Sequence, residues 1–386
     1  MDTIAIHNIP VVKSKYGPEL TLCRILRPLF HLVRFLGLAP FNFVEKYSIL
    51  HLEPSTRACI CSLCSMLINT YMVMTVTRDL LALNRKQKVQ HYIEICKVLL
   101  NYIVLMMELV RSITTRQQLI KVWDRIQVFD ESLQLLLGYD EISSKKRLPK
   151  SHTYQSMIIH LQRCVWIIFA ISTVGWTAVN VLGMYAYHET YLRNISYMIP
   201  YVLTFIVALK FCGLVYLINQ RLSLLIDYLS HKRGKKFRES DEDETTIEMI
   251  ETMLRQLERV CEYLNGIYTW PLLYLLYNIF CHLLSNSYSI ALRFMIRMEH
   301  GEHWPSILCR LSWFFMFSIQ LGLIHLMCHS VSLKKSDLFH ISREVRFTAA
   351  DCFQINLGTL ASTVKHLVTY LVILLQMDPD SGIPHK

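Results

Sequence analysis

Residues 196–220 read SYMIPYVLTFIVALKFCGLVYLINQ, and Lys210 is the only charged side chain among them. A helix needs about 20 predominantly apolar residues to cross a bilayer, whereas apolar runs of about 10–14 residues are typical of helices in soluble cores. This run therefore predicts a membrane-spanning helix. Lys210 has no carboxylate within one helical turn, so we expect its side chain to face the interior of a helix bundle or a water-filled cavity.

The rest of the chain contains further apolar runs of similar length. Of its 386 residues, 53% are hydrophobic and 18% are charged, whereas soluble domains contain about 25% charged residues. We therefore predict an all-α fold, a seven-transmembrane helical bundle. The predicted spans are 56–77, 91–113, 157–187, 196–220, 266–292, 305–330 and 351–377.

The segment before the first span contains a shorter apolar stretch at residues 28–43. This stretch is too short to cross a bilayer and includes Arg34 and Pro40, but its apolar positions recur at helical spacing. Such a pattern favours a helix that lies in the membrane interface or re-enters it. We therefore predict that residues 1–55 form a cytoplasmic N-terminal segment with an interfacial helix.

Lys and Arg are distributed unevenly between the two sides of the predicted bundle. If the N-terminus lies inside, the inner segments contain 27 of the 40 Lys and Arg residues, and the outer segments contain eight. Loops rich in Lys and Arg stay on the cytoplasmic side of a membrane. We therefore predict a cytoplasmic N-terminus, a cytosolic loop or helix at residues 331–350, and an extracellular tail at residues 378–386.

This asymmetry also accounts for the net charge of +10, which in a soluble protein would suggest nucleic-acid binding. Basic loops of membrane proteins orient the chain and lie next to anionic lipids. The sequence contains no basic motif interleaved with aromatic residues, so we predict membrane lipids and not nucleic acid as partners.

The cysteines help to separate classes of receptor. None of the twelve lies in a predicted outer loop, and reduced cysteines packed as small apolar residues are the simplest interpretation. A metabotropic receptor of the rhodopsin-like class has an outer N-terminus and typically an outer-loop disulfide, so it is the weaker alternative. Cys59, Cys61 and Cys64 lie within an apolar span without a second pair, which favours a structural role over metal binding.

An enzyme is the alternative from a different class of proteins. His325 and His329 are four residues apart, and two Glu and two His residues lie within 299–303. Neither set has the HExxH order of metalloproteases, and neither a nucleophile motif nor a phosphate-binding glycine loop accompanies them. We therefore predict no enzyme activity, no cofactor and no metal site.

The longest predicted inner loop, residues 221–265, contains an amphipathic helix. Its apolar residues recur at steps of three and four, and such a stripe needs a partner in the cytosol. The partner is either the extensions of neighbouring spans or another subunit. The stripe consists of Ile247, Ile250, Met253, Leu254, Leu257, Val260, Cys261 and Leu264.

Two pairs of ionisable residues lie inside predicted spans. Glu94 and Lys97 are three residues apart, and so are Glu108 and Arg111. Residues at this spacing are neighbours on a helix surface, so we predict that each pair forms within its own helix.

The last predicted span, residues 351–377, reads DCFQINLGTLASTVKHLVTYLVILLQM. Steps of three and four place Thr369, Ile373 and Gln376 on one helix face. A polar stripe at membrane depth needs water or a partner. If the span lined a pore, Gln376 beside Met377 would form a polar ring with a hydrophobic constriction.

Helix packing is the alternative explanation of the same residues. Thr369 and Tyr370 would then pack and hydrogen-bond between helices, while Gln376 would cap the end of the span. The pattern of residues is compatible with both interpretations.

Thr369 and Tyr370, followed by five apolar residues and Gln376, resemble the TYxxxxxQF signature that ends the last span of insect gustatory receptors. Met377 departs from this signature, because the family usually has Phe there. With the predicted topology and the length, the resemblance covers nearly the whole chain. Two shorter segments resemble family patterns ahead of the first and fifth spans, namely 37–41 (GLAPF) and 264–270 (LNGIYTW).

The resemblance implies a subunit of a ligand-gated, non-selective cation channel in the plasma membrane of a sensory neuron. Four gustatory receptor subunits, identical or different, would surround one central pore for permeant cations and would be joined by a helical cytosolic anchor. On this interpretation residues 56–330 form a six-span ligand-binding bundle that includes loop 221–265, and residues 351–377 line the pore. The residues placed at the pore or gate are Gln376, Met377, Ile373 and Thr369.

The resemblance also implies that the ligand is a small-molecule tastant. Receptors of the sugar-sensing branch tend to have Glu after the signature Tyr, whereas this chain has Leu371. A bitter compound or a contact pheromone is therefore favoured over a sugar. A channel subunit that resembles insect odorant receptors is the alternative.

Aromatic residues are concentrated in the outer halves of the predicted middle spans. An aromatic-lined cavity would bind an amphipathic organic molecule by stacking and burial, and the aromatic belt of membrane proteins is the alternative. The candidate ligand-binding residues are Trp176, Tyr185, Tyr201 and Tyr288. The sequon Asn194-Ile195-Ser196 lies at a predicted outer loop, so Asn194 is a candidate glycosylation site.

Overall fold

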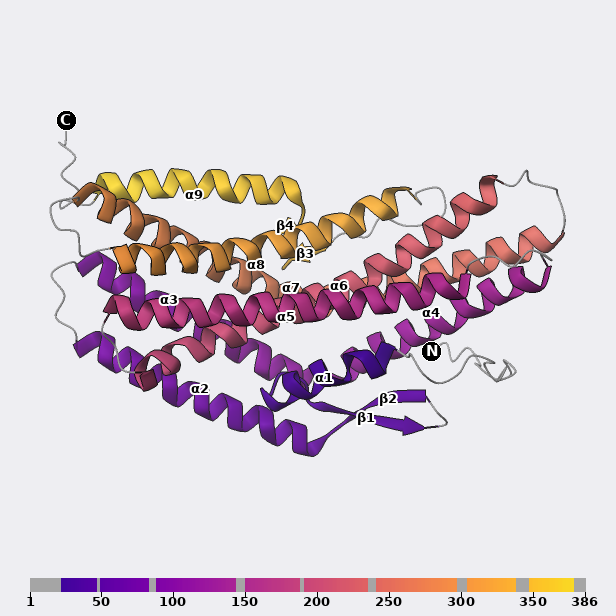
Figure 1. Cartoon of the computed structure of the whole chain (residues 1–386), viewed down its shortest axis with the longest axis horizontal. Helices are drawn as coiled ribbons and strands as arrows, with labels where there is room; N and C mark the ends of the chain where they lie inside the picture. Colours follow the sequence, from indigo (N-terminus) through magenta and orange to yellow (C-terminus); the bar gives the residue numbers. More distant parts are fainter. Residues whose placement is uncertain are drawn as a thin grey trace.

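The computed structural model describes residues 22–46, 49–82, 88–143, 150–187, 191–234, 241–296, 304–337 and 347–377. In these ranges long helices lie side by side along the longest axis of the molecule (Figure 1). The helices are α1 (Leu22–Phe35), α2 (Thr56–Ala82), α3 (Lys88–Thr114), α4 (Arg116–Ser143), α5 (Lys150–Tyr187), α6 (Tyr191–Gly234), α7 (Asp241–Ile296), α8 (Trp304–Asp337) and α9 (Leu357–Met377). Two antiparallel hairpins accompany them, β1 (Phe41–Lys46) with β2 (Ile49–Pro54) and β3 (Thr348–Ala349) with β4 (Phe353–Gln354).

Six helical stretches of the described chain are long and apolar enough to cross a membrane, and they overlap six of the seven predicted spans. The exception is the predicted span 91–113, which is helix α3 in the structure. It differs from the others because residues 91–113 include four charged residues, Glu94, Lys97, Glu108 and Arg111. Three of them, Glu94, Lys97 and Glu108, are buried in the bundle. That α3 crosses the membrane stays a prediction.

The predicted interfacial helix at residues 28–43 has the wrong boundaries, because α1 ends at Phe35. Gly37 follows with a φ of +80°, and the Leu38 amide donates to the Val33 carbonyl at 2.9 Å, as in a glycine-terminated helix end. A Cβ at Gly37 would lie 2.8 Å from the Cβ of Ser65, so α1 approaches α2 too closely for a side chain there.

The described chain is mostly helical, as predicted, but it also contains two short hairpins that the sequence did not indicate. β1 and β2 pair from Phe41 with Pro54 to Lys46 with Ile49, where the prediction had placed the end of a helix. The last predicted span also begins later, since α9 starts at Leu357. Asn356 accepts a hydrogen bond from the Thr359 amide at 2.9 Å and stops the helix from extending further toward the N-terminus.

Helix α7 joins two elements that the sequence suggested as separate. It is 56 residues long and contains both the predicted fifth span and the amphipathic helix of loop 221–265. The described residues of the apolar stripe, from Ile250 to Leu264, are buried. Their partner is α4, a helix of the same chain that we did not predict. The buried apolar side chains of α4 are Leu119, Val122, Trp123, Ile126, Phe129, Leu133 and Leu136.

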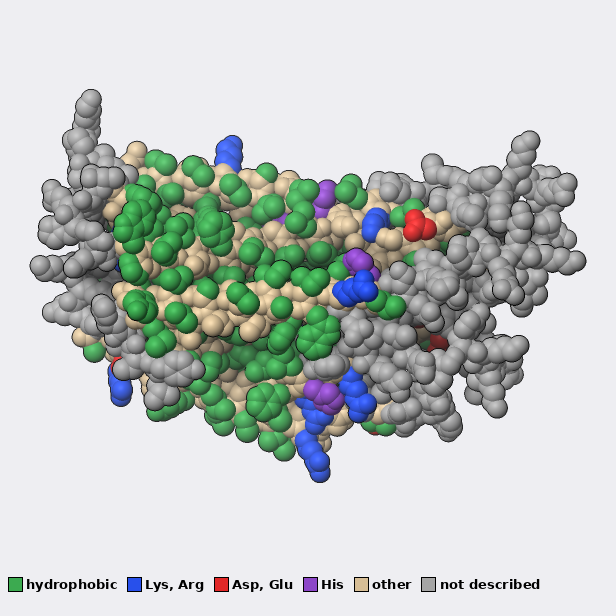
Figure 2. Space-filling model, in the orientation of Figure 1, with side chains coloured by type: hydrophobic (Ala, Val, Ile, Leu, Met, Phe, Trp, Pro, Cys, Tyr) green, Lys and Arg blue, Asp and Glu red, His purple; other side chains and the backbone are tan. Residues whose placement is uncertain are grey.

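The outer surface of the bundle is apolar over much of its length. Figure 2 shows hydrophobic side chains spread along the helices of one face. Large exposed side chains include Leu67, Tyr71 and Met74 on α2, and Ile171 and Val174 on α5. Soluble monomers rarely expose contiguous apolar surface of this kind, so the surface fits contact with lipid.

The orientation of the bundle can be tested directly. We expect an epitope fused after Lys386 to be labelled on intact cells, and one fused before Met1 to need permeabilisation. The reason is the difference of 27 against eight Lys and Arg residues between the predicted sides. The measurement is antibody staining of expressing cells, and labelling at Met1 without permeabilisation would overturn the topology.

Candidate functional site: an aromatic cluster, buried ion pairs and the last helix

Side chains from four helices meet in an aromatic cluster. The ring centroid of Trp313 lies 5.0 Å from that of Tyr201 and 5.5 Å from that of Trp176. His282 stacks on Phe317, with centroids 4.3 Å apart. Edge-on and stacked contacts of this kind stabilise aromatic groups beyond the burial of their area. The aromatic cluster consists of Trp176 on α5, Tyr197, Tyr201 and Phe205 on α6, His282 on α7, and Trp313 and Phe317 on α8.

An ion network borders the aromatic cluster. Glu94 Oε2 lies 3.0 Å from Lys97 Nζ, which confirms the predicted pair within α3. Glu94 Oε1 also accepts a hydrogen bond from Arg310 Nη1 on α8 at 2.7 Å, a contact that we did not predict. All three residues are buried, and Arg310 lies one turn before Trp313 of the aromatic cluster on α8. The network therefore links α3 and α8 beside the aromatic rings.

Several buried polar atoms at the aromatic cluster have no hydrogen-bond partner in the described part of the chain. They are Trp176 Nε1, Tyr201 Oη, His282 Nε2 and Gln320 Nε2, on side chains that are 8%, 3%, 2% and 2% exposed. An unsatisfied buried polar group costs about 1–3 kcal/mol. This cost is removed when a water molecule or a ligand supplies the missing partner.

The four predicted ligand-binding residues do not all lie at one site in the structure. Trp176 and Tyr201 belong to the aromatic cluster and are buried. Tyr288 is also buried, but it lies further along α7 and is not a member of the cluster. Tyr185 is 74% exposed near the end of α5, where it does not contribute to a buried site.

The candidate glycosylation site, Asn194, is buried at the start of α6. Its amide nitrogen donates to the Asn180 carbonyl oxygen at 2.9 Å and to the Asn180 side-chain oxygen. A glycan is attached through this same nitrogen, so modification would require the hydrogen bonds to break. Glycosylation of Asn194 stays a prediction.

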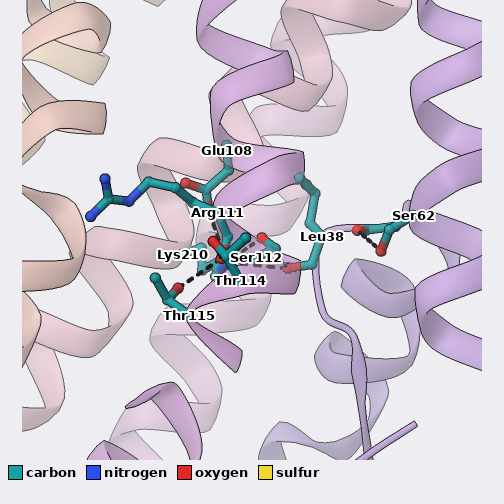
Figure 3. Close-up of polar contacts among 9 residues, drawn as sticks. Leu38, Ser62, Glu108, Arg111, Ser112, Thr114, Thr115 and Lys210 are labelled. Carbon is teal, nitrogen blue, oxygen red and sulfur yellow. Dashed lines mark hydrogen bonds and ion pairs between the residues drawn. The ribbon is translucent and has the colours of Figure 1, made fainter. Parts of the chain in front are cut away.

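Lys210 lies inside the bundle, as predicted, and joins three parts of the chain (Figure 3). Its Nζ donates to Glu108 Oε1 on α3 at 2.8 Å and to the Leu38 carbonyl at 3.1 Å. Ser112 Oγ also donates to the Leu38 carbonyl, at 3.3 Å. The predicted pair of Glu108 with Arg111 is therefore wrong, because Glu108 pairs with Lys210 while Arg111 donates to the Gly266 carbonyl.

A second buried ion pair connects α6 with α4. Arg221 Nε donates to Asp130 Oδ1 at 2.8 Å, and Arg221 Nη2 donates to Asp130 Oδ2 at 2.5 Å. Arg221 is 0% exposed. Two parallel hydrogen bonds fix the relative orientation of the two groups as well as their distance, so this pair sets how α4 packs on the continuation of α6.

Helix α9 differs from the other candidate spans because none of its apolar window is buried within the subunit. It lies at the edge of the bundle beside α8 (Figure 1). Tyr370 contacts the ring of Phe280 on α7 with centroids 6.1 Å apart, and Thr369 Oγ1 donates to the Lys365 carbonyl within α9. Residues Ile373, Gln376 and Met377 are exposed.

The histidines considered for metal binding do not form a cluster. His325 Nδ1 lies 2.9 Å from the Leu321 carbonyl of its own helix, and residues 299–303 lie outside the described part of the chain. Within the described ranges no group of three His, Cys, Asp or Glu side chains is placed to hold a metal ion.

The chain belongs to the family of seven-transmembrane chemosensory receptors. The sequence model of this family, described as 7tm Chemosensory receptor, matches residues 26–345. The resemblance to insect chemosensory receptors is thus confirmed at the level of the family, which is one of receptor channels and not of enzymes. The match ends before α9, so it does not depend on the signature in the last span.

Two solved structures resemble the fold, the insect olfactory receptor OR5 from Machilis hrabei and the same receptor in complex with eugenol. The first has a TM-score of 0.64 at 14% identity, and the second has a TM-score of 0.65 at 13% identity. Both comparisons cover 92% of this chain and 99% of the other chain. At these identities the likeness concerns the fold alone. No curated protein sequence matches the chain.

Proposed function

We propose that this chain is a gustatory receptor, a subunit of a ligand-gated, non-selective cation channel in the plasma membrane of a sensory neuron. Its ligand is a small organic tastant, and a bitter compound or a contact pheromone is favoured over a sugar because Leu371 follows the signature Tyr370. The subunits assemble as a homo- or hetero-tetramer around one pore.

Helix α9 is the observation that carries the channel proposal. It is apolar enough to span a membrane, yet none of its apolar window is buried by the rest of the subunit. Leu360, Leu367 and Tyr370 pack toward the bundle, and the face with Thr369, Ile373 and Gln376 lies largely away from them. A helix with one packed face and one free, partly polar face suits a position between its own subunit and a water-filled pore.

The aromatic cluster is the proposed ligand site. It lies toward the helix ends predicted to face outward and combines stacked rings with buried polar atoms that have no partner in the described chain. Ligand sites are typically apolar and aromatic with a few polar groups that fix orientation. The structure of olfactory receptor OR5 with eugenol provides a precedent for a small aromatic ligand in a protein of this fold.

We expect Gln376→Ala and Met377→Ala to change selectivity among cations or to raise basal current, with little change in ligand potency. A residue repeated around the axis of a tetramer forms a ring, and the width and polarity of the ring decide wetting and ion dehydration. The measurement is reversal potential and basal current in expressing cells, with Gln118→Ala on an exposed position of α4 as control. Wild-type selectivity and basal current in both variants at normal surface levels would contradict the pore assignment.

A subunit of an odorant receptor channel is the second candidate. The likeness of fold to two olfactory receptor structures favours it. The two candidates differ in the physical state of the ligand, so a panel that contains both volatile and non-volatile compounds distinguishes them. Currents evoked by volatile compounds alone would favour the odorant receptor.

A further inference from the structure

We infer that the aromatic cluster binds a small organic molecule that accepts hydrogen bonds and donates none, such as a ketone, an ester or an ether. The inference rests on the proposed function, because it takes the aromatic cluster as the ligand site. It adds the chemical class of the ligand, which follows from the polar atoms that surround the rings.

The polar atoms available to a ligand are three nitrogens and the hydroxyl of Tyr201, which can donate a hydrogen bond as well as accept one. Trp176 Nε1 can only donate a hydrogen bond, and the amide nitrogen of Gln320 can only donate as well. His282 Nε2 is the third nitrogen without a partner in the described chain. Trp176 contacts the ring of Trp313, while His282 contacts the rings of Phe317 and Tyr201. Gln320 lies one turn beyond Phe317 on α8.

None of the atoms without a partner at the aromatic cluster is restricted to accepting, since the Tyr201 hydroxyl can also donate and His282 Nε2 donates in one tautomer of the ring. Both carboxylate oxygens of Glu94 are already used, one by Lys97 and the other by Arg310. Among the members of the aromatic cluster, the oxygens are the hydroxyls of Tyr197 and Tyr201, and each of these also has a proton to donate. A ligand hydroxyl would therefore bring a donor into a site that is already rich in donors.

The charges beside the cluster favour the same class of ligand. Lys97 and Arg310 are two cations that face one carboxylate, Glu94, within hydrogen-bond distance. In a buried environment such charges act strongly, because water does not screen them. They favour the negative end of a carbonyl or ester dipole at the side of the cluster next to Arg310, which lies one turn before Trp313 on α8.

Compounds with one carbon skeleton and different functional groups test the inference. Acetophenone, 1-phenylethanol and ethylbenzene form one such set, and 2-heptanone, 2-heptanol and heptane form another. We expect the ketone of each set that opens the channel to act at a concentration at least about tenfold lower than the alcohol, and the hydrocarbon to be weaker still. The measurement is whole-cell current against free ligand concentration in cells that express the wild-type chain.

A substitution that removes the Nε1 donor and keeps an aromatic, though smaller, side chain tests the role of Trp176. We expect Trp176→Phe to weaken the response to the ketone at least about fivefold and to leave the response to the hydrocarbon unchanged. Trp166→Phe is the matched control, because Trp166 lies on the same helix and is 53% exposed. Gln320→Leu is a second donor variant in case Trp176→Phe does not reach the cell surface.

The outcomes separate this inference from the proposed function. If the alcohols act as well as or better than the ketones, and Trp176→Ala abolishes the response, then the aromatic cluster is the ligand site but the inferred class is wrong. Equal responses in Trp176→Phe, Gln320→Leu and the wild type would also overturn it. If none of these probes opens the channel, the inferred class is overturned. If no compound of a wider panel evokes a current either, the proposed function is contradicted as well.

Discussion

Glu108→Gln is expected to destabilise the folded subunit by about 3–5 kcal/mol, because it leaves the Lys210 ammonium buried without its counter-charge. Glu108 is 3% exposed, and its Oε1 lies 2.8 Å from Lys210 Nζ. The loss of stability is expected to affect more than the contact between α3 and α6, since Lys210 also donates to the Leu38 carbonyl ahead of the first hairpin. The measurement is the melting temperature of the purified subunit in mild detergent, followed by size-exclusion chromatography.

The double variant Glu108→Gln with Lys210→Met distinguishes two contributions to the free energy of unfolding. One is the penalty for an unpaired buried charge, and the other is the net contribution of the ion pair. Replacing both partners of a buried pair is often close to neutral, so we expect the double variant to recover most of the stability. Glu251→Gln is the matched control, because Glu251 pairs with Arg255 on the surface of α7. Exposed pairs contribute about 0.2–1 kcal/mol. Equal melting temperatures for Glu108→Gln and Glu251→Gln would show that the Lys210 contacts are not structural.

Leu254→Asp is expected to prevent α4 from packing on α7 and to reduce the amount of folded protein at least about tenfold. Leu254 is 1% exposed in the core between these helices, and an isolated carboxylate costs several kcal/mol to bury. Because the partner helix belongs to the same chain, we expect the monomer itself to misfold. The measurement is the monodisperse fraction in detergent and resistance to limited proteolysis.

Thr252→Asp is the control for Leu254→Asp, because Thr252 is exposed two residues earlier on the same helix. It introduces the same charge on the solvent side and should leave the yield within about twofold, since surface substitutions usually change stability by less than about 0.5 kcal/mol. A well-folded subunit with altered oligomer size in Leu254→Asp would instead indicate that this stripe faces a second subunit.

Two parts of the chain independently support the family. The signature from Thr369 to Gln376 lies in the last helix, whereas the family match covers residues 26–345. The resemblance predicted from a short motif therefore agrees with a match over most of the remaining sequence. The assignment as a gustatory receptor depends on the motif and stays a proposal.

The candidate site was only partly predictable. Trp176 and Tyr201 were identified because aromatic residues stand out in apolar spans, but the same criterion selected Tyr185, which is exposed. A polar stripe on α7 carried a signal that we did not use, since its residues recur at steps of three and four inside an apolar helix. The buried residues of this stripe are Asn278, His282, Ser285, Asn286 and Ser289.

Helix α4 was not predicted for a related reason. Eight of its 28 residues are charged, so nothing in its composition indicates a membrane span. Its buried face includes Trp123 and Phe129. In the sequence this face can be recognised only from apolar residues that recur at helical spacing in an otherwise polar segment. Such a period identifies a helix but not its partner.

The sequence by itself determined the class of protein, the approximate positions of the long helices and the expected orientation, because apolar length, helical period and the distribution of Lys and Arg are local properties of the chain. The tertiary structure alone decided which charges meet between different helices. Lys210 and Glu108 are 102 residues apart, Arg310 and Glu94 are 216 apart, and Arg221 and Asp130 are 91 apart. The sequence pattern suggested Arg111 as the partner of Glu108, since residues one turn apart are always neighbours. The packing of α3 against α6 brought Lys210 closer, and contacts of this kind depend on how whole helices pack rather than on any one segment.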